Sequence, residues 1–272
     1  MVYLKKYLGK AVRRLGIRDE VVIASKVAGY KHIPYTITKS IEKINRRIGF
    51  KIDLIQHHWP PPFYASICRV VHGLEKAIEQ GLVNHYGLSN YDEETLVKVL
   101  ECSRKYDPVS NQIQYSLGYR VAENKLIGIM RRNRIGLIAW SPLAKGALAG
   151  LDKPITHAQK TDPVFKRVVN DQELQKLLEE LANKYRVSRT AIVLAWLIYK
   201  NAVPIPGTRR VERVDEYISA TKITLSNNDI KQLDKATEKY KRVWGLRYSS
   251  VTRMKYIPGF LQGLTLRLLG GI

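Results

Sequence analysis

The chain has 272 residues, 45% of them hydrophobic, which is enough to bury one large core of the size that α/β barrels commonly build as a single domain. Lys and Arg number 46 against 24 Asp and Glu, so the formal net charge is +22, and anionic partners are favoured. No apolar run reaches bilayer-spanning length and the N-terminus lacks the apolar stretch of a signal peptide, which excludes a membrane-spanning protein and predicts a soluble, cytoplasmic one.

In chain order, short apolar runs alternate with segments whose apolar residues recur at three- and four-residue spacings. The recurring spacings predict helices over 3–15, 37–48, 64–80, 92–105, 121–134, 171–185, 188–200, 209–220 and 226–240. The short runs predict strands over 21–26, 53–58, 83–88, 109–114, 136–140 and 203–206. Thr36 is placed to cap the second helix, and Ser226 with Asp229 resembles a capping box for the last one.

Short apolar strands that alternate with amphipathic helices predict parallel strands joined by helical crossovers. An open, doubly wound sheet is the rival fold, but no G-x-G-x-x-G follows a strand. We therefore expect a (β/α)8 barrel domain over residues 1–245, followed by a tail of basic and apolar residues over 246–272. Six predicted strands fall short of the eight in such a barrel, so we expect the first two strands to be missing.

The remaining compositional features predict no metal site and no specific nucleic-acid partner. Cys68 and Cys102 lack a C-x-x-C pairing and a histidine at zinc-ligand spacing, so we expect buried thiols in a reducing compartment. Basic residues are spread along the helices without a nucleic-acid motif, and a generally basic proteome, such as a thermophilic one, explains them more simply.

Polar motifs stand where five of the predicted strands end. Lys26 ends the first strand, and His58 ends the second and directly precedes Trp-Pro. The later motifs are Gly87-Leu88-Ser89-Asn90, Gln112, Trp140-Ser141-Pro142-Leu143, and Gly207-Thr208-Arg209 followed by Arg213 and Glu216. This ordered set resembles the aldo-keto reductases, which pass a hydride between a nicotinamide and a carbonyl carbon. The resemblance covers residues 3 to 240.

By this resemblance, Lys26 and His58 take the catalytic lysine and histidine roles. In the family the lysine lowers the pKa of a tyrosine that protonates the carbonyl oxygen, and the histidine orients the carbonyl; a phenol otherwise titrates too high for this work. His58 is preferred to His57 because it lies five residues after Asp53 and precedes Trp-Pro, as in the family.

The resemblance also implies NADP(H) as the cofactor. Ser89, Asn90 and Gln112 match residues that hold the nicotinamide carboxamide, although Ser89-Asn90 could instead cap a helix, and Gln112 could be a satisfied buried amide. Trp140 would stack on the nicotinamide, and Ser141, Pro142 and Leu143 would lie near the pyrophosphate. The last motif would grip the 2′-phosphate and the adenine through Gly207, Thr208, Arg209 or Arg210, Arg213 and Glu216. Tyr217 departs from the asparagine that the family has after this glutamate.

The family's D-x-A-x-x-Y-G motif, which supplies the catalytic Asp and Tyr, has no counterpart ahead of the first predicted helix. We therefore expect an NADPH-dependent reductase of small aldehydes or ketones that is impaired in the chain as it stands, or a decayed fragment without a stable fold. The alternative is a non-catalytic NADP(H)-binding regulatory protein resembling potassium-channel β subunits. A homo-oligomer could cover the gap in the barrel. The tail could be a lid, an oligomer contact or a membrane contact, and packing against the barrel is favoured.

Overall fold

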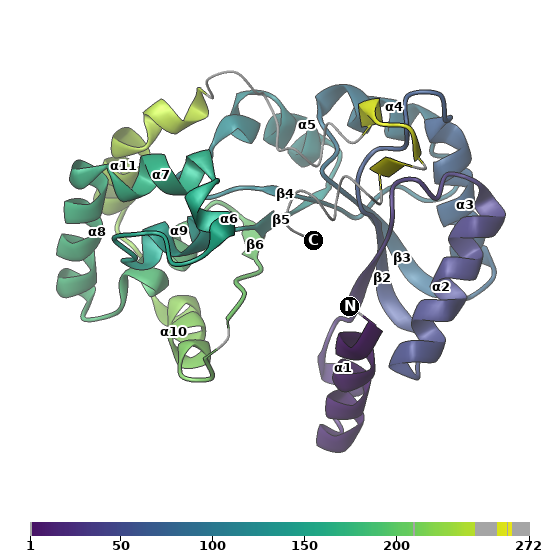
Figure 1. Ribbon diagram of the computed structural model, residues 1–272, viewed down its shortest axis with the longest axis horizontal. Helices are drawn as coiled ribbons and strands as arrows, with labels where there is room; N and C mark the ends of the chain where they lie inside the picture. The colour runs from purple at the N-terminus through teal and green to yellow at the C-terminus, as the bar shows by residue number, and fades with distance from the viewer. Residues whose placement is uncertain (1, 209, 243–254, 260, 263–272) are drawn as a thin grey trace. The chain divides into compact units, whose positions relative to one another are not determined.

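The computed structural model describes residues 2–208, 210–242, 255–259 and 261–262 (Figure 1). The chain folds into two compact units. The first unit combines Met1–Asn111 with Tyr248–Ile272, and the second unit is Gln112–Arg247. Each of the six predicted strands is present, and hydrogen-bonded neighbours follow the chain order from β1 to β6. The expectation that two further strands precede them stays a prediction.

The first unit is built on the parallel strands β1 to β3, with helices packed against them (Figure 1). Its elements are α1 (Val2–Leu15), η1 (Arg18–Glu20), β1 (Ala24–Val27), α2 (Pro34–Ile48), β2 (Ile52–His57), α3 (Ile67–Glu79), β3 (Val83–Ser89) and α4 (Glu93–Cys102). Isoleucines and valines of α2, α3 and the strands form one continuous apolar core, as expected for strands buried on both faces. The register pairs Lys26 with Gln56 and His57 with Leu88, which brings the three strand ends to one edge.

The second unit begins within β4 and continues through two further strands and a set of helices. Its elements are β4 (Ser110–Gln114), η2 (Val121–Asn124), α5 (Leu126–Arg132), β5 (Gly136–Trp140), η3 (Ala144–Ala149), α6 (His157–Lys160), α7 (Pro163–Val169), α8 (Gln172–Tyr185), α9 (Arg189–Tyr199), β6 (Ala202–Pro204), α10 (Arg213–Ser219), η4 (Ala220–Lys222), α11 (Asn227–Ala236) and η5 (Glu238–Lys241). Strands β5 and β6 are parallel. Helix α9 is almost entirely buried, which explains its nearly continuous apolar sequence.

Two predicted helix caps need correction. Helix α2 begins at Pro34 with Ile33 as its N-cap, and the Thr36 hydroxyl, within the first turn, donates to the Ile33 carbonyl. Proline at the first helical position is well suited to start a helix, so the helix begins earlier than a Thr36 cap would allow. Ser226 does cap α11, but Asp229 accepts the Ser226 hydroxyl proton rather than its backbone N–H, so the reciprocal capping box is not formed.

Helix α1 presents most of its apolar stripe to solvent. Of residues 4–15, for which burial is described, the helix buries Gly9 and Val12, and a Cβ atom at Gly9 would overlap the Ile48 carbonyl oxygen of α2. The side chains of Leu4, Tyr7, Leu8 and Leu15 are exposed, with 70%, 66%, 40% and 66% of their surface accessible. A stripe of this kind is a candidate contact surface.

The expectation of buried thiols is wrong. Cys68, near the start of α3, and Cys102, the last residue of α4, form a disulfide across 34 positions of sequence. The reason is the packing of α3 beside α4, which sets the two Cα atoms 4.9 Å apart, within the range that a disulfide requires. Cys68 is exposed and Cys102 is half-buried.

The predicted tail over 246–272 is described at residues 255–259, 261 and 262, which pack on the first unit. The other tail residues that were predicted to pack against the barrel lie outside the described residues. Within the described ranges, no helix has both the length and the apolar character needed to cross a bilayer.

Candidate active site

Lys26 and His58 lie at the carboxyl ends of two adjacent parallel strands in the first unit. Lys26 is the penultimate residue of β1, and His58 follows the last residue of β2. The backbone N–H of His58 donates to the carbonyl oxygen of Val27, the neighbour of Lys26, at 2.9 Å. The carboxyl edge of a parallel sheet is where barrel enzymes carry their chemistry, so this pair occupies a suitable position.

Burial and nearby positive charge hold His58 in its neutral form. Burial lowers the pKa of His58 to about 3, and the positive charge of Lys26 and the neighbouring His57 add to the effect. The pKa of Lys26 is itself lowered by burial. His58 is thus a neutral imidazole near pH 7, able to donate or accept a hydrogen bond without carrying charge.

The structure separates the roles of the two adjacent histidines. The fully buried His57 is held at both ring nitrogens: Nδ1 lies 2.7 Å from the Tyr91 hydroxyl, and Nε2 lies 3.2 Å from the Lys31 carbonyl oxygen. His58 is half-exposed, and its ring lies against Trp59 with centroids 4.8 Å apart. His57 is therefore committed to the fold, whereas His58 has the access that a substrate contact needs.

Ser89 and Asn90 lie at the end of β3, on the same edge as Lys26 and His58. The Asn90 side-chain amide donates to the His58 carbonyl oxygen at 3.0 Å and to the Ser89 hydroxyl at 3.1 Å. Asn90 adopts a left-handed backbone conformation with φ of 60°. The helix-cap alternative does not apply to either residue, because Asp92 caps α4 by accepting the Thr95 N–H. The Asn90 side chain instead holds the backbone of His58 through its hydrogen bond to the His58 carbonyl oxygen.

Among the described residues, Lys26 has no hydrogen-bond or ion-pair partner. Its charged neighbour is Lys5 of α1, whose pKa is lowered by burial and then by the charges of Arg47 and Lys26. Sequence reasoning missed Lys5, although its position one turn before the buried Gly9 and Val12 was a signal that it faces the protein. Among the described residues, the Lys26 amine therefore has another lysine, Lys5, as a neighbour and no paired carboxylate.

In the second unit, the ends of β4 and β5 carry the next predicted residues. Gln112 is buried in β4, and the Tyr115 N–H donates to the Trp140 carbonyl oxygen at 3.4 Å. Trp140 and Ser141 are half-buried, and Ser141 has a φ of 53°. Pro142 and Leu143 are buried in the turn that follows. A positive φ at a serine is strained, and such strain is common where a loop serves a binding site.

The last predicted motif lies beside a cavity of about 440 Å³ in the second unit. Arg213 and Glu216 of α10 line this cavity, together with Gly150, Asn183, Ser188 and Arg189. Gly207 and Thr208 are exposed, and Arg209 lies outside the described residues. Tyr217, which departs from the family pattern, donates its hydroxyl proton to the Gly207 carbonyl oxygen at 3.1 Å. This bond ties α10 to the loop that precedes it.

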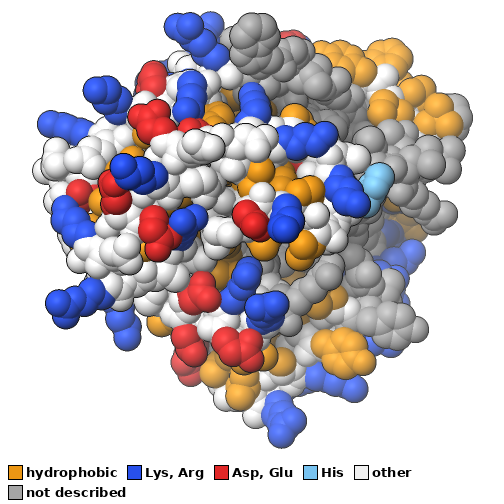
Figure 2. All heavy atoms as spheres, turned by 60° about the vertical axis from the view of Figure 1, so that its left-hand side comes forward, with side chains coloured by type: hydrophobic (Ala, Val, Ile, Leu, Met, Phe, Trp, Pro, Cys, Tyr) orange, Lys and Arg blue, Asp and Glu red, His pale blue; other side chains and the backbone are white. Residues whose placement is uncertain are grey.

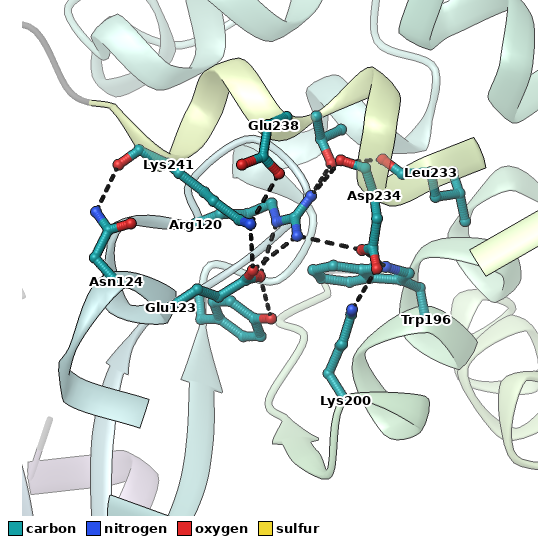
Figure 3. Close-up of polar contacts among 11 residues, drawn as sticks. Arg120, Glu123, Asn124, Trp196, Lys200, Leu233, Asp234, Glu238 and Lys241 are labelled. Atoms are coloured by element: carbon teal, nitrogen blue, oxygen red, sulfur yellow. Dashed lines mark hydrogen bonds and ion pairs between the residues drawn. The ribbon is translucent and has the colours of Figure 1, made fainter. Parts of the chain in front are cut away.

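A buried ion network that sequence reasoning missed lies elsewhere in the second unit (Figure 3). Only 1% of the Arg120 surface is accessible, and its guanidinium group donates to the Glu123 carboxylate, the Asp234 carbonyl oxygen and the Thr237 hydroxyl, each at 2.7 Å. The Tyr115 hydroxyl also donates to Glu123 at 2.7 Å. The network anchors the segment after β4 to α11, so it supports the position of β4.

The distribution of basic side chains bears on the predicted absence of a nucleic-acid partner, which stays a prediction. Figure 2 shows one face of the molecule, on which Lys and Arg side chains are scattered and interspersed with Asp and Glu. Several form ion pairs, such as Lys184 with Asp229 at 2.8 Å.

Comparison with known proteins identifies the family. The profile described as the aldo/keto reductase family matches residues 2–238. A protein of Saccharomyces cerevisiae provisionally named an aryl-alcohol dehydrogenase is 31% identical over 214 residues, covering 75% of this chain and 61% of the relative. The chloroplastic pyridoxal reductase of Arabidopsis thaliana is 30% identical over 250 residues, covering 86% of this chain and 67% of the relative. The chain thus spans about two thirds of the length of these relatives or less.

Solved structures agree on the fold. A thermostable aldo-keto reductase, solved in complex with the inhibitor epalrestat, matches with a TM-score of 0.72 and 27% identity, covering 86% of this chain and 77% of that one. An aldo-keto reductase from Klebsiella pneumoniae in complex with NADPH matches with a TM-score of 0.72 and 23% identity, covering 91% and 79%, which shows likeness of fold alone. The predicted fold of the (β/α)8 barrel type is confirmed. The chain belongs to the aldo/keto reductase family.

Proposed function

We propose that the chain is an NADP(H)-dependent oxidoreductase that acts on a small aldehyde or ketone and the corresponding alcohol. The observation that carries this proposal is the cluster at the strand edge of the first unit. Lys26 and His58 end adjacent strands, and Asn90, at the end of the third, holds the His58 backbone. A lysine, a neutral histidine and amide groups at one sheet edge suit carbonyl chemistry beside a nicotinamide.

The residues present fit such a cofactor in both units. In the first unit, Ser89 and Asn90 have the hydroxyl and amide groups that a carboxamide pairs with. In the second unit, Arg213 and Arg189 line a cavity of about 440 Å³, and guanidinium groups suit a nucleotide phosphate and an adenine plane. Gln112, Trp140, Ser141, Pro142, Leu143, Gly207, Thr208, Arg209 and Glu216 complete the proposed set by family resemblance. A bound nicotinamide supplies the hydride.

We propose a distinct task for each of the two catalytic candidates. His58 is neutral near pH 7, so its ring can donate a hydrogen bond to a carbonyl oxygen and orient the carbonyl carbon toward the hydride. Lys26 can lower the pKa of a phenolic proton donor placed beside it, because an adjacent cation favours the phenolate. Neither residue is itself the proton donor in this assignment.

None of the described residues is assigned the role of proton donor. Lys26 contacts neither a tyrosine hydroxyl nor a carboxylate among them, so we propose that the chain alone reduces carbonyls slowly. The test is to fuse a segment with the family's D-x-A-x-x-Y-G motif ahead of Met1. Turnover of an aromatic aldehyde with NADPH should rise about 10²–10⁴-fold, the usual contribution of a general acid. Equal turnover in the fused and unfused chains would overturn the assignment.

An aromatic aldehyde is the appropriate first substrate because two relatives are named after aryl alcohols and pyridoxal. The control is the same fusion with phenylalanine in place of the motif's tyrosine, which keeps the added strands but removes the hydroxyl. This control should bind NADPH as tightly as the active fusion and reduce the aldehyde no faster than the unfused chain.

Because Lys26 has no partner among the described residues, a second function is also favoured, a non-catalytic NADP(H)-binding regulator similar to potassium-channel β subunits. The two functions differ in a single-turnover experiment. A regulator quenches protein fluorescence on binding NADPH, but it does not oxidise NADPH when an aldehyde is added in excess. Slow but measurable oxidation that disappears in a His58→Ala variant supports the oxidoreductase.

A further inference from the structure

The disulfide between Cys68 and Cys102 is accessible to solvent at Cys68, and it lies close to the described C-terminal residues. Both cysteines line an open pocket of about 420 Å³ in the first unit. The opposite wall is formed by Pro60, Pro61, Pro62 and Phe63, the segment between His58 and α3, and by Lys255 and Tyr256. The pocket thus joins the disulfide to the segment after His58 and to the C-terminal residues.

The described C-terminal residues are attached to both of the elements that the disulfide joins. On the side of α4, the Lys255 amine pairs with Asp92, the cap of that helix, at 2.8 Å. On the side of α3, the Phe63 N–H donates to the Lys255 carbonyl oxygen at 2.8 Å, and the Gly259 N–H donates to the Tyr64 hydroxyl at 3.0 Å. Lys255 therefore joins the N-cap of α4 to the segment that precedes α3, and the disulfide connects these same two helices.

The same C-terminal segment reaches the neighbour of His58. The Trp59 ring N–H donates to the side-chain oxygen of Gln262 at 2.8 Å, and both side chains are buried. Because the Trp59 ring lies against His58, a change in how the segment is held is felt one residue from the histidine. No contact of this kind was expected from the sequence, where positions 59 and 262 are 203 residues apart.

We propose that Cys68–Cys102 is a reversible redox site. Its oxidised form fixes the start of α3 against the end of α4 and so supports residues 255–259, 261 and 262, and its reduction loosens these residues beside His58. The proposal stands apart from the proposed function, since it concerns a modification and a structural response that do not require catalysis.

The chemistry balances with a dithiol as the reductant. One thiolate of the dithiol attacks the exposed Cys68 sulfur, the Cys68–Cys102 bond breaks, and the Cys102 sulfur takes the electron pair and a proton. The second thiolate of the reductant then attacks the mixed disulfide and releases Cys68. Cys68 leaves as a thiolate at the second position of α3, where the N-terminal end of a 13-residue helix stabilises negative charge. The protein gains two electrons, and the reductant becomes a cyclic disulfide.

Alkylation of the native protein tests the redox site. Iodoacetamide, followed by intact-mass measurement, should add no groups to the untreated chain and two groups after incubation with dithiothreitol without denaturant. Labelling of both cysteines before any reduction would overturn the proposal, and so would a disulfide that survives excess dithiothreitol in the folded protein. Removal of the dithiothreitol in air should restore the unlabelled state.

Hydrogen exchange tests the structural response. Reduction should speed exchange of the Phe63 and Gly259 amide hydrogens several-fold, since these amides hold the C-terminal segment. The midpoint of thermal unfolding should fall by about 5–10 °C, because the bond closes a loop of 34 residues in the unfolded chain. A Cys68→Ser, Cys102→Ser variant should behave like the reduced protein and ignore dithiothreitol.

A matched control distinguishes lost support of the described C-terminal residues from a general loosening of the first unit. Lys255→Met removes the ion pair with Asp92 and should speed Gly259 exchange in both redox states while leaving the disulfide reducible. Unchanged exchange at Phe63 and Gly259 after complete reduction would overturn the structural part of the proposal. If the double variant fails to fold, the reduced natural chain still supplies the comparison, because its cysteines are altered only after folding.

Discussion

Arg120 and Glu123 are joined by two hydrogen bonds of 2.7 Å, one from Nε and one from Nη2, in the interior of the second unit (Figure 3). Arg120 is the N-cap of η2 and Glu123 lies within that helix, three residues later, so their pairing is local. The partners that complete the network, Asp234 and Thr237, come from more than 100 residues later. Through Arg120, the pair thus links two segments that lie far apart in the sequence. Burial on its own would raise the pKa of Glu123, but the hydrogen bonds from Arg120 and Tyr115 and the positive charges of Arg120 and Lys200 together lower it, and the carboxylate stays ionised.

Replacement of Arg120 should be among the most destabilising single changes in the second unit. Arg120→Met leaves the Glu123 carboxylate without its main partner, and breaking a buried pair costs about 3–5 kcal/mol. Arg131→Met, at an exposed position of α5, is the matched control and should change the free energy of unfolding by less than about 0.5 kcal/mol. Urea unfolding followed by tryptophan fluorescence measures both, and similar costs for the two variants would contradict the structural role of the network.

Asp229 should make the second unit sensitive to acid. Burial opposes ionisation, but hydrogen bonds from Lys184, Ser226 and Tyr185 lower its pKa from 3.8 to about 2. A carboxyl whose folded pKa lies below its unfolded value stabilises the fold above the unfolded pKa. This contribution, about 2 kcal/mol, is therefore present above pH 4 and lost as the pH falls from 4 to 2. Asp229→Asn should remove that pH dependence from the unfolding free energy, and a curve parallel to that of the natural chain would refute the assignment.

The arginines near α10 should affect cofactor binding differently. Arg209 or Arg210 is proposed to contact the 2′-phosphate and Arg213 the adenine, and NADH has the adenine but no 2′-phosphate. A variant with both Arg209→Ala and Arg210→Ala should therefore bind NADPH about 10-fold to 100-fold more weakly and bind NADH unchanged, because a charge-assisted bond contributes about 1.5–3 kcal/mol. Arg213→Ala should weaken both cofactors. Fluorescence titration measures all four affinities, and equal affinity of the natural chain for NADPH and NADH would contradict the phosphate assignment.

Replacement by alanine should lower the free energy of unfolding more at His57 than at His58. His57→Ala removes a buried ring that bonds Tyr91 and Lys31, and it should lower the free energy of unfolding by about 1–3 kcal/mol. His58→Ala removes a half-exposed ring without a side-chain hydrogen bond among the described residues, so its cost should stay below about 1 kcal/mol. Chemical denaturation provides the measurement. A larger cost at His58 than at His57 would reverse the assignment of structural and functional roles.

The exposed stripe of α1 should promote self-association. Leu4, Tyr7 and Leu15 present apolar side chains that a soluble monomer ordinarily covers. We expect the natural chain to form oligomers at micromolar concentration and a Leu4→Glu, Tyr7→Glu variant to shift toward the monomer. Light scattering at several concentrations is the measurement. Lys6→Glu, on an exposed and already polar position of the same helix, controls for added negative charge, and a monomeric natural chain would exclude the stripe as a contact.

Much of the local structure was predictable from the sequence because its causes are local. Runs such as Gly136 to Trp140 are too short and too apolar to be anything but buried strands, and the structure places a strand over those five residues. The order of motifs at the strand ends predicted the family, since each motif needs only its own strand and the turn after it. The positions of Lys26 and His58 at the strand ends were therefore predictable from the sequence.

Other features required the folded chain. The helix start at Pro34 was misplaced because a proline at the first helical position competes with a plausible cap two residues later, and local spacing does not rank them. The disulfide was missed because it depends on α3 and α4 packing side by side, which no spacing rule between positions 68 and 102 expresses.

The sequence by itself determined the class of fold, the order of its strands and the residue types that stand at their ends, because helix and strand periodicities and turn residues act over a few positions. Only the tertiary structure decided which partners those residues meet. Arg120 donates hydrogen bonds to Asp234 and Thr237, and Trp59 donates one to Gln262. Lys26 has Lys5 as its charged neighbour. These contacts join positions that are up to 203 residues apart. Burial and charge at such contacts depend on the packing of whole elements, and that packing sets the protonation state of His58 and the pairing of the two cysteines.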